Sequence, residues 1–152
     1  FLNIFFSFLV FAIIGIVIWQ ISGKNVQFSY VVRGCAETEH GTTAKALGPG
    51  EEQEPKIEVQ GNNVIYSRAT NHLCCRKVEF RKEITGNTIN IYEFWTGKGC
   101  RCICFSELRA EVKNLPIGKY VVNVYKKGIM PGNENIPMNQ TLIISQEVVI
   151  NR

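Results

Sequence analysis

The chain has 152 residues, a formal net charge of +4 and six cysteines. All 13 acidic residues are glutamate, so calcium loops of the DxDxDG type and catalytic triads oriented by aspartate are excluded. The small positive excess is spread along the chain, so we expect no nucleic-acid partner. The cysteine density of a domain this small predicts an oxidising, extracytoplasmic location.

Residues 1–23 are almost entirely apolar, and the first charged side chain is Lys24. As a helix, the segment would be about 30–35 Å long and could cross a bilayer, where only a helix satisfies the backbone of an isolated segment. Asn3, Ser7 and Gly15 would share one face, where small and polar residues let helices pack closely. We therefore expect a transmembrane or filament-core helix at 1–23 and an extracytoplasmic domain at 24–152.

The first residue, Phe1, and the stretch "FAIIGIV" resemble the N-terminal segment of type IV pilins. Bacterial members carry glutamate at the fifth mature position; Phe5 stands there, which resembles archaeal members. In that family a basic leader is removed and the apolar helix enters the core of an extracellular filament. The resemblance implies a structural pilus-like subunit, membrane-held before assembly, self-associating through its N-terminal helix, with an adhesive outer shell of β-domains.

Two other interpretations of the apolar segment remain open. It could be a plain single-pass anchor that tethers an extracytoplasmic binding module for an unknown surface ligand. It could also be a secretory signal, although no small-residue cleavage site follows it. The filament interpretation is the favoured one, and the anchored binding module is its main alternative.

The remainder of the chain predicts β-strands separated by turns. Alternating apolar and polar residues, or hairpin patterns, predict strands at 26–33, 56–60, 64–68, 78–84, 88–95, 100–115, 119–125 and 141–150. About eight short strands without helical periodicity indicate a mainly β fold, an antiparallel sandwich. The long polar loop after Cys35 and the loop before residue 141 would face the environment. The second loop ends in a sequon that makes Asn139 a candidate for glycosylation.

The stretch "EVKNLPIGKYVVNVY" at 111–125 resembles the corner between late strands of immunoglobulin-like and transthyretin-like domains. The resemblance implies an immunoglobulin-like sandwich in which Tyr120 is the corner tyrosine. Its hydroxyl would reach back to the backbone across a turn shaped by Pro116 and Gly118. Such sandwiches host many functions, so the corner predicts fold alone.

The cysteines are more consistent with disulfides than with a metal site. Alternate cysteines on a regular strand are about 6.6–7 Å apart, whereas thiolates sharing a tetrahedral ion lie closer than about 4 Å. A strand bearing one group beside a strand bearing the other would permit two crosslinks, and the remaining pairings stay open. A metal or redox role is a weaker alternative. The disulfide candidates are Cys35, Cys74, Cys75, Cys100, Cys102 and Cys104, the last three predicted to face inward.

No catalytic pattern emerges from the two histidines. His72 precedes Cys74 by two residues, but no third group that would orient a nucleophile is evident. His40 lies in the long polar loop, and no phosphate loop, G-x-S-x-G or H-E-x-x-H motif occurs. We therefore expect a protein without enzymatic activity, cofactor or metal.

Overall fold

The computed structural model describes residues 26–34, 50–97, 100–128 and 140–151. Within these ranges the chain forms strands and no helix, and so no helix there is suited to crossing a membrane. The predicted helix at 1–23, with Asn3, Ser7 and Gly15, lies outside the described residues, as do Cys35 and Asn139. The strands are β1 (Gln27–Gly34), β2 (Gln53–Gln60), β3 (Asn63–Leu73), β4 (Lys77–Thr85), β5 (Thr88–Thr96), β6 (Ile103–Lys113), β7 (Gly118–Gly128) and β8 (Thr141–Ile150).

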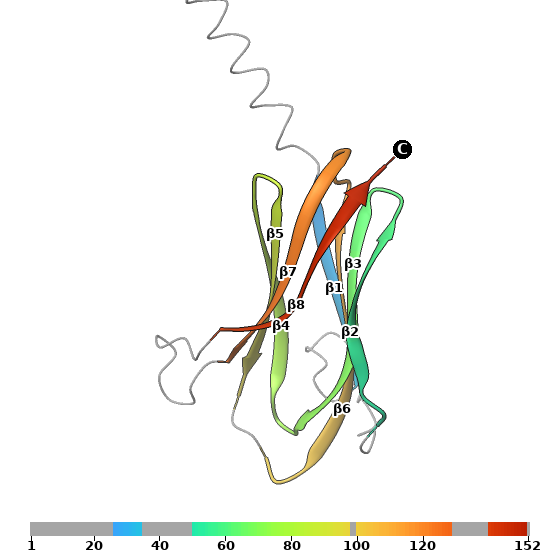
Figure 1. The fold of residues 1–152 in the computed structure, drawn as a ribbon. Coiled ribbons are helices and arrows are strands. Elements are labelled where there is room, and N and C mark those ends of the chain that lie inside the picture. Colours follow the sequence, from blue (N-terminus) through green and yellow to red (C-terminus); the bar gives the residue numbers. More distant parts are fainter. Residues whose placement is uncertain (1–25, 35–49, 98–99, 129–139, 152) are drawn as a thin grey trace, which may run out of the picture.

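The eight strands form two four-stranded sheets that pack as a sandwich, which confirms the predicted layer architecture (Figure 1). The first sheet, which we call sheet A, has the order β1-β6-β3-β2, and the second, sheet B, has the order β4-β5-β7-β8. All pairs are antiparallel except β5 and β7, which run parallel. The prediction of a purely antiparallel, immunoglobulin-like sandwich is therefore wrong in its topology.

The physical reason lies in how consecutive strands are connected. The immunoglobulin order places strands A, B, E and D in one sheet and C, F and G in the other. Here the β4–β5 hairpin enters sheet B with β5 on the inside, so that β5 rather than β4 lies beside β7. Alternation of side chains predicts which residues face inward, but it does not determine which strand becomes the neighbour of which.

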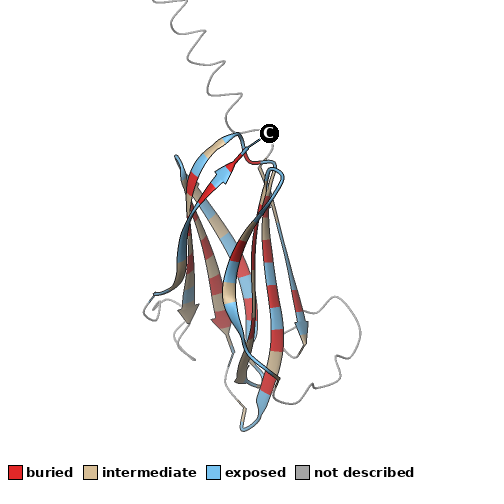
Figure 2. Cartoon of the chain, turned by 45° about the vertical axis from the view of Figure 1, so that its right-hand side comes forward, coloured by how far each residue is buried: buried red, intermediate tan, exposed pale blue. Residues whose placement is uncertain are grey.

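The core lies between the sheets and follows the alternation in the sequence. On β5, the residues Ile89, Ile91, Glu93 and Trp95 are buried while their neighbours are half-exposed. Every second residue from Cys104 to Val112 on β6 and from Tyr120 to Val124 on β7 is buried in the same way, which gives the striped pattern of Figure 2. This period of two is typical of strands that bury one face, and apolar burial on it stabilises the fold.

The β2–β3 hairpin is longer than the sequence predicted. Strand β2 begins at Gln53, and β3 continues to Leu73. Side chains extend the pairing at this end: Asn71 forms two hydrogen bonds with the backbone of Gly50, and the Glu52 carboxylate accepts one from the Asn71 backbone N–H at 2.8 Å. These side-chain hydrogen bonds satisfy backbone N–H and C=O groups that would otherwise lack a partner at the end of the hairpin, and alternation in the sequence does not reveal them.

Two disulfides close the end of the sandwich where the chain crosses between sheets. Cys74 bonds Cys102 and Cys75 bonds Cys100, so the β3–β4 connection is joined to the segment that enters β6. The predicted crosslinks between the two cysteine groups are therefore confirmed. Gly97 allows the close approach, because it has a φ of +88° and a Cβ there would lie 2.6 Å from the Cys75 carbonyl oxygen.

The predicted inward orientation of the three later cysteines is only partly right. Strand β6 begins at Ile103, so Cys100 and Cys102 precede it; Cys100 is half-buried and Cys102 is exposed. Only Cys104 is buried, and it too is disulfide-bonded. The prediction assumed a regular strand from residue 100 onward. The disulfides to Cys74 and Cys75 instead hold Cys102 and Cys100 outside that regular geometry.

The loop between β6 and β7 brings Tyr120 back over Pro116. The Tyr120 hydroxyl donates a hydrogen bond to the Pro116 carbonyl oxygen at 3.0 Å, and the ring is buried beside Gly118. Burial raises the pKa of the Tyr120 hydroxyl, because removal from water disfavours its ionised form. This local contact is present although the surrounding topology is not that of an immunoglobulin domain.

Candidate functional site

Aromatic and cationic side chains gather on the outer face of sheet B. Five of them form a continuous group, which we call the aromatic–cation strip: Arg81 on β4, Tyr92 and Phe94 on β5, and Tyr125 and Lys127 on β7. Their positions alternate with the buried residues of the same strands, so all five face away from the core. The three rings are half-buried and Arg81 is exposed.

Strand register brings these side chains together from distant parts of the sequence. Arg81 lies opposite Tyr92 across the β4–β5 pair. Across the parallel β5–β7 pair, Tyr92 lies opposite Tyr125 and Phe94 lies opposite Lys127. Cross-strand neighbours of this kind have Cβ atoms about 4.5–5.5 Å apart, so their side chains pack directly.

The rings and cations of the strip hold one another in place. The Tyr92 and Tyr125 rings stack with centroids 5.6 Å apart, and Tyr92 lies 6.1 Å from Phe94. The Lys127 Nζ is 4.0 Å from the Tyr92 ring centroid, and the Arg81 guanidinium is 4.6 Å from the Phe94 centroid. Each cation lies over the electron-rich face of a ring, which stabilises both groups. The strip is thus ordered before any partner binds.

Glu79 and Glu83 flank Arg81 on the same face of β4, but neither forms an ion pair with the cations of the strip in the described structure. Neither Arg81 nor Lys127 forms an ion pair with any of the residues that the structure describes. The nearest carboxylate contact is made by Tyr92, whose hydroxyl donates to Glu83 at 2.9 Å. Partial burial, and secondly this hydrogen bond, raise the pKa of the Tyr92 hydroxyl, because both disfavour its ionised form.

A row of polar side chains borders the strip on the same face. The Ser145 hydroxyl donates to Asn123 Oδ1 at 2.7 Å, and Asn123 Nδ2 donates to Asn90 Oδ1 at 3.1 Å. The row crosses β8, β7 and β5, and it leaves part of each amide group free for further hydrogen bonds. Beyond Tyr125, on the edge strand β8, the side chain of Leu142 is 51% exposed.

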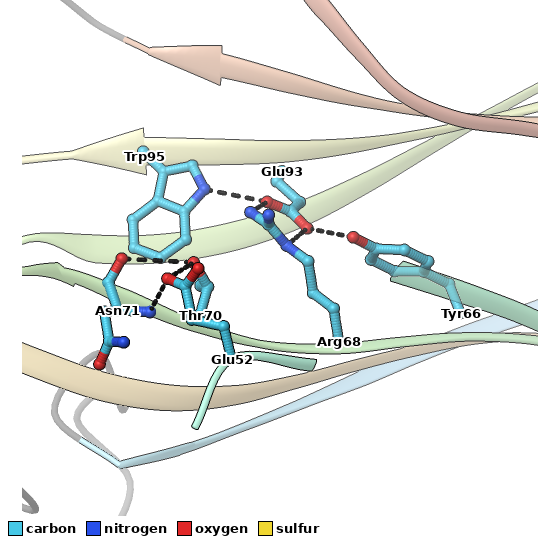
Figure 3. Close-up of polar contacts among 7 residues, drawn as sticks. All are labelled: Glu52, Tyr66, Arg68, Thr70, Asn71, Glu93 and Trp95. Atoms are coloured by element: carbon cyan, nitrogen blue, oxygen red, sulfur yellow. Dashed lines mark hydrogen bonds and ion pairs between the residues drawn. The ribbon is translucent and has the colours of Figure 1, made fainter. Parts of the chain in front are cut away.

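Between the sheets, a buried ion pair is surrounded by hydrogen-bond donors (Figure 3). Glu93 is fully buried and forms two contacts with the Arg68 guanidinium, at 2.9 Å to Oε1 and 2.5 Å to Oε2. Tyr66 donates to the same carboxylate at 2.7 Å and the Trp95 indole donates at 3.0 Å. Burial and the charge of Glu93 raise the pKa of Tyr66. With all its hydrogen bonds made inside the core, this network serves structure rather than ligand binding.

His72 does not assemble a nucleophilic site. Its Nε2 lies 2.9 Å from the Ser106 Oγ and its Nδ1 lies 3.0 Å from the Leu73 carbonyl oxygen. The carbonyl can only accept, so Nδ1 carries the proton and Ser106 donates to Nε2. Ser106 is fully buried, which leaves its hydroxyl no access to substrate. Among the described residues, no group of histidine, cysteine and glutamate side chains could hold a metal ion.

The sequence prediction missed the strip because of the parallel pair. Tyr92 and Phe94 stand out as alternate aromatic residues within "INIYEFW", and Tyr125 and Lys127 are spaced in the same way in "VNVYKK". Each pattern alone indicates only the exposed face of a strand. Their meeting depends on β5 lying beside β7 in parallel register, which no local pattern encodes.

Comparisons with known proteins do not supply a family. No protein-family model, curated protein or solved structure matches this chain. The resemblance of "FAIIGIV" to type IV pilins is thus unsupported by any relative, and the described part of the chain is all β. Neither the pilin nor the immunoglobulin resemblance therefore identifies a family for this chain.

Proposed function

We propose that this chain is an extracytoplasmic recognition domain that binds an acidic protein surface through the aromatic–cation strip. The observation that carries the proposal is the pairing of three ordered rings with two cations that have no carboxylate partner among the described residues. Two disulfides are compatible with an extracellular or secreted location. The apolar segment at 1–23 would act as a membrane tether.

The composition of the strip supports a protein partner. Tyrosine, phenylalanine and arginine are enriched in protein interfaces, and tyrosine and arginine dominate their binding energy. Because Tyr92, Tyr125 and Lys127 already pack together, binding costs little side-chain entropy. The unpaired cations favour an acidic partner, since complementary charge accelerates encounter and excludes partners of like charge.

The test compares capture of extracellular proteins by three forms of the full chain in a non-ionic detergent. One form is unchanged, one carries Tyr92→Ser with Lys127→Glu, and the control carries Lys119→Glu. Lys119 is exposed on the same strand as Lys127, eight residues away or about 26 Å, so the control makes the same charge change on the same face. A captured protein is then purified and its affinity for each form is measured.

The proposal expects a partner whose affinity falls at least about thirtyfold with the strip variant, which corresponds to the loss of a binding hot spot. The Lys119→Glu form should bind within about threefold of the unchanged chain, and binding should weaken as salt is raised. Equal capture by all three forms would contradict a role of the strip in recognition.

A further inference from the structure

A second surface feature lies on the outer face of sheet A, on the other side of the sandwich from the aromatic–cation strip. It is a half-open hollow of about 460 Å³ that crosses all four strands of the sheet. Its volume is within the range of small-molecule sites. The lining side chains that face outward are Val31 and Arg33 on β1, Glu107 and Arg109 on β6, Ser67 on β3 and Gln53 on β2.

The hollow carries an excess of positive charge. In the β1–β6 register, Arg33 lies opposite Glu107, and Arg109 lies opposite Val31, so the two arginines are diagonal neighbours. Neither arginine forms an ion pair or a hydrogen bond with any described residue. Glu107 lies beside both arginines and offsets one of their two positive charges, so a net charge of one remains in this part of the hollow for an anionic ligand.

The remaining lining groups indicate the rest of the ligand. Val31, with half of its surface exposed, provides an apolar patch between the arginines. The Ser67 hydroxyl and the Gln53 side-chain amide lie at the other side of the hollow, and each can both donate and accept hydrogen bonds. An anionic group beside a compact body bearing hydroxyl groups would pair with the two arginines and hydrogen-bond Ser67 and Gln53.

We propose that the hollow binds a small anionic sugar, with its carboxylate or phosphate held by Arg33 and Arg109. Guanidinium groups recognise both anions through paired hydrogen bonds, and arginine is preferred over lysine where that fork geometry is used. The sugar ring contacts Val31 and hydrogen-bonds Ser67 and Gln53. This site shares no residue with the aromatic–cation strip, so the proposal of a sugar ligand does not depend on the proposed protein partner.

The test titrates the full chain, in a non-ionic detergent, with three probes: glucuronate, glucose 6-phosphate and glucose. Calorimetry or amide chemical shifts report the affinity. We expect saturable binding of at least one of the two anions and none of glucose. Binding of the uronate alone identifies the carboxylate as the recognised group, and binding of the phosphate alone identifies the phosphate.

Two variants and one control locate the binding site. Arg33→Gln and Arg109→Gln should each weaken anion binding by about tenfold or more, because each removes charged hydrogen bonds. The control Arg101→Gln removes the same charge at an exposed position outside the hollow and should leave the affinity unchanged. All three arginines are exposed, so the fold tolerates their replacement. Absence of anion binding, equal binding of glucose, or equal affinity in all variants would overturn the proposal.

Discussion

Arg68 on β3 and Glu93 on β5 form an ion pair that joins the two sheets through the middle of the core. Glu93 is fully buried, and the Arg68 side chain is only 13% exposed. Taking both charges out of water is costly, so the pair adds little net stability by itself. Removing either residue alone is nevertheless strongly destabilising, because it leaves the charge of the other buried without a counter-ion.

The first prediction concerns this pair. Glu93→Gln keeps the shape and an acceptor for Tyr66, but leaves the buried Arg68 charge without a counter-ion. The variant should lose about 3–5 kcal/mol of unfolding free energy, measured by urea titration.

The double variant Arg68→Met with Glu93→Gln distinguishes an uncompensated charge from lost packing. It should be more stable than Glu93→Gln alone, because no unpaired charge remains in the core. The exposed Glu79→Gln on the same sheet should change stability by less than about 0.5 kcal/mol. A double variant as unstable as the single one would show that the ion pair is not the cause.

The second prediction concerns the two disulfides, which close nested loops. Cys74–Cys102 and Cys75–Cys100 have sequence separations of 28 and 25 residues. Either bridge alone would restrict the unfolded chain by about 3.5 kcal/mol, but the second then closes a ring of only a few residues and adds about 2 kcal/mol. Removing one bridge as a Cys→Ser pair should therefore cost less than half as much as removing both. Additive losses in denaturant unfolding would contradict the nested-loop account.

The third prediction is an acid destabilisation that depends on His72. Burial lowers the pKa of His72, and the positive charges of Lys126 and Arg76 lower it further, although the Leu73 carbonyl acts in the opposite direction. The remaining neighbours, Ser106 and the Trp95 ring at 4.9 Å, carry no charge. Below about pH 6.5, the unfolded chain therefore binds a proton that the folded chain binds less readily, and stability falls as the pH is lowered.

His72→Gln isolates this contribution from that of the carboxylates. Unfolding free energies at pH 7.5 and pH 5.5 should show a smaller decrease for the variant than for the unchanged chain, because its side chain does not titrate. The stability difference between the two proteins therefore narrows in acid. Parallel pH profiles would mean that His72 has the same pKa in the folded and the unfolded chain, and would contradict this prediction.

The fourth prediction tests the turn before β7. Tyr120→Phe removes the hydroxyl that donates to the Pro116 carbonyl and should lower the unfolding free energy by about 1 kcal/mol. Tyr30→Phe is the matched control, since the Tyr30 hydroxyl has no hydrogen-bond partner among the described residues and the residue is 36% exposed. Equal effects of the two substitutions would show that the hydrogen bond does not stabilise the turn.

Local sequence patterns predicted the positions of the strands well, but they did not predict which strands and side chains contact one another. The alternation in "INIYEFW" places Ile89, Ile91 and Trp95 inward, as observed, because burial on one face is a local property of the strand. The same alternation could not show that Glu93 finds Arg68 across the core, since their contact depends on how the sheets pack. A buried glutamate within an apolar strand was the available signal for a partner of opposite charge.

The same difference between local features and long-range contacts applies to the disulfides and the candidate site. The cysteine groups were predicted to crosslink because their clustering is visible in the sequence, and two such bridges are present. The aromatic–cation strip was not predicted, because Tyr92 meets Tyr125 only through the parallel β5–β7 pair. Neighbouring parallel strands are joined by long connections, so no short turn motif in the sequence indicates that they pair.

Photo-crosslinking from a position beside the aromatic–cation strip tests the central claim most directly. A photoreactive phenylalanine analogue in place of Leu142 would stand beside Tyr125, and the same analogue in place of Ile103 is the control; these side chains are 51% and 50% exposed. With extracellular proteins present, we predict a crosslinked partner from position 142, none from position 103, and loss of the product when Lys127→Glu is added. Equal yields from both positions, or a product that survives Lys127→Glu, would contradict recognition through the strip.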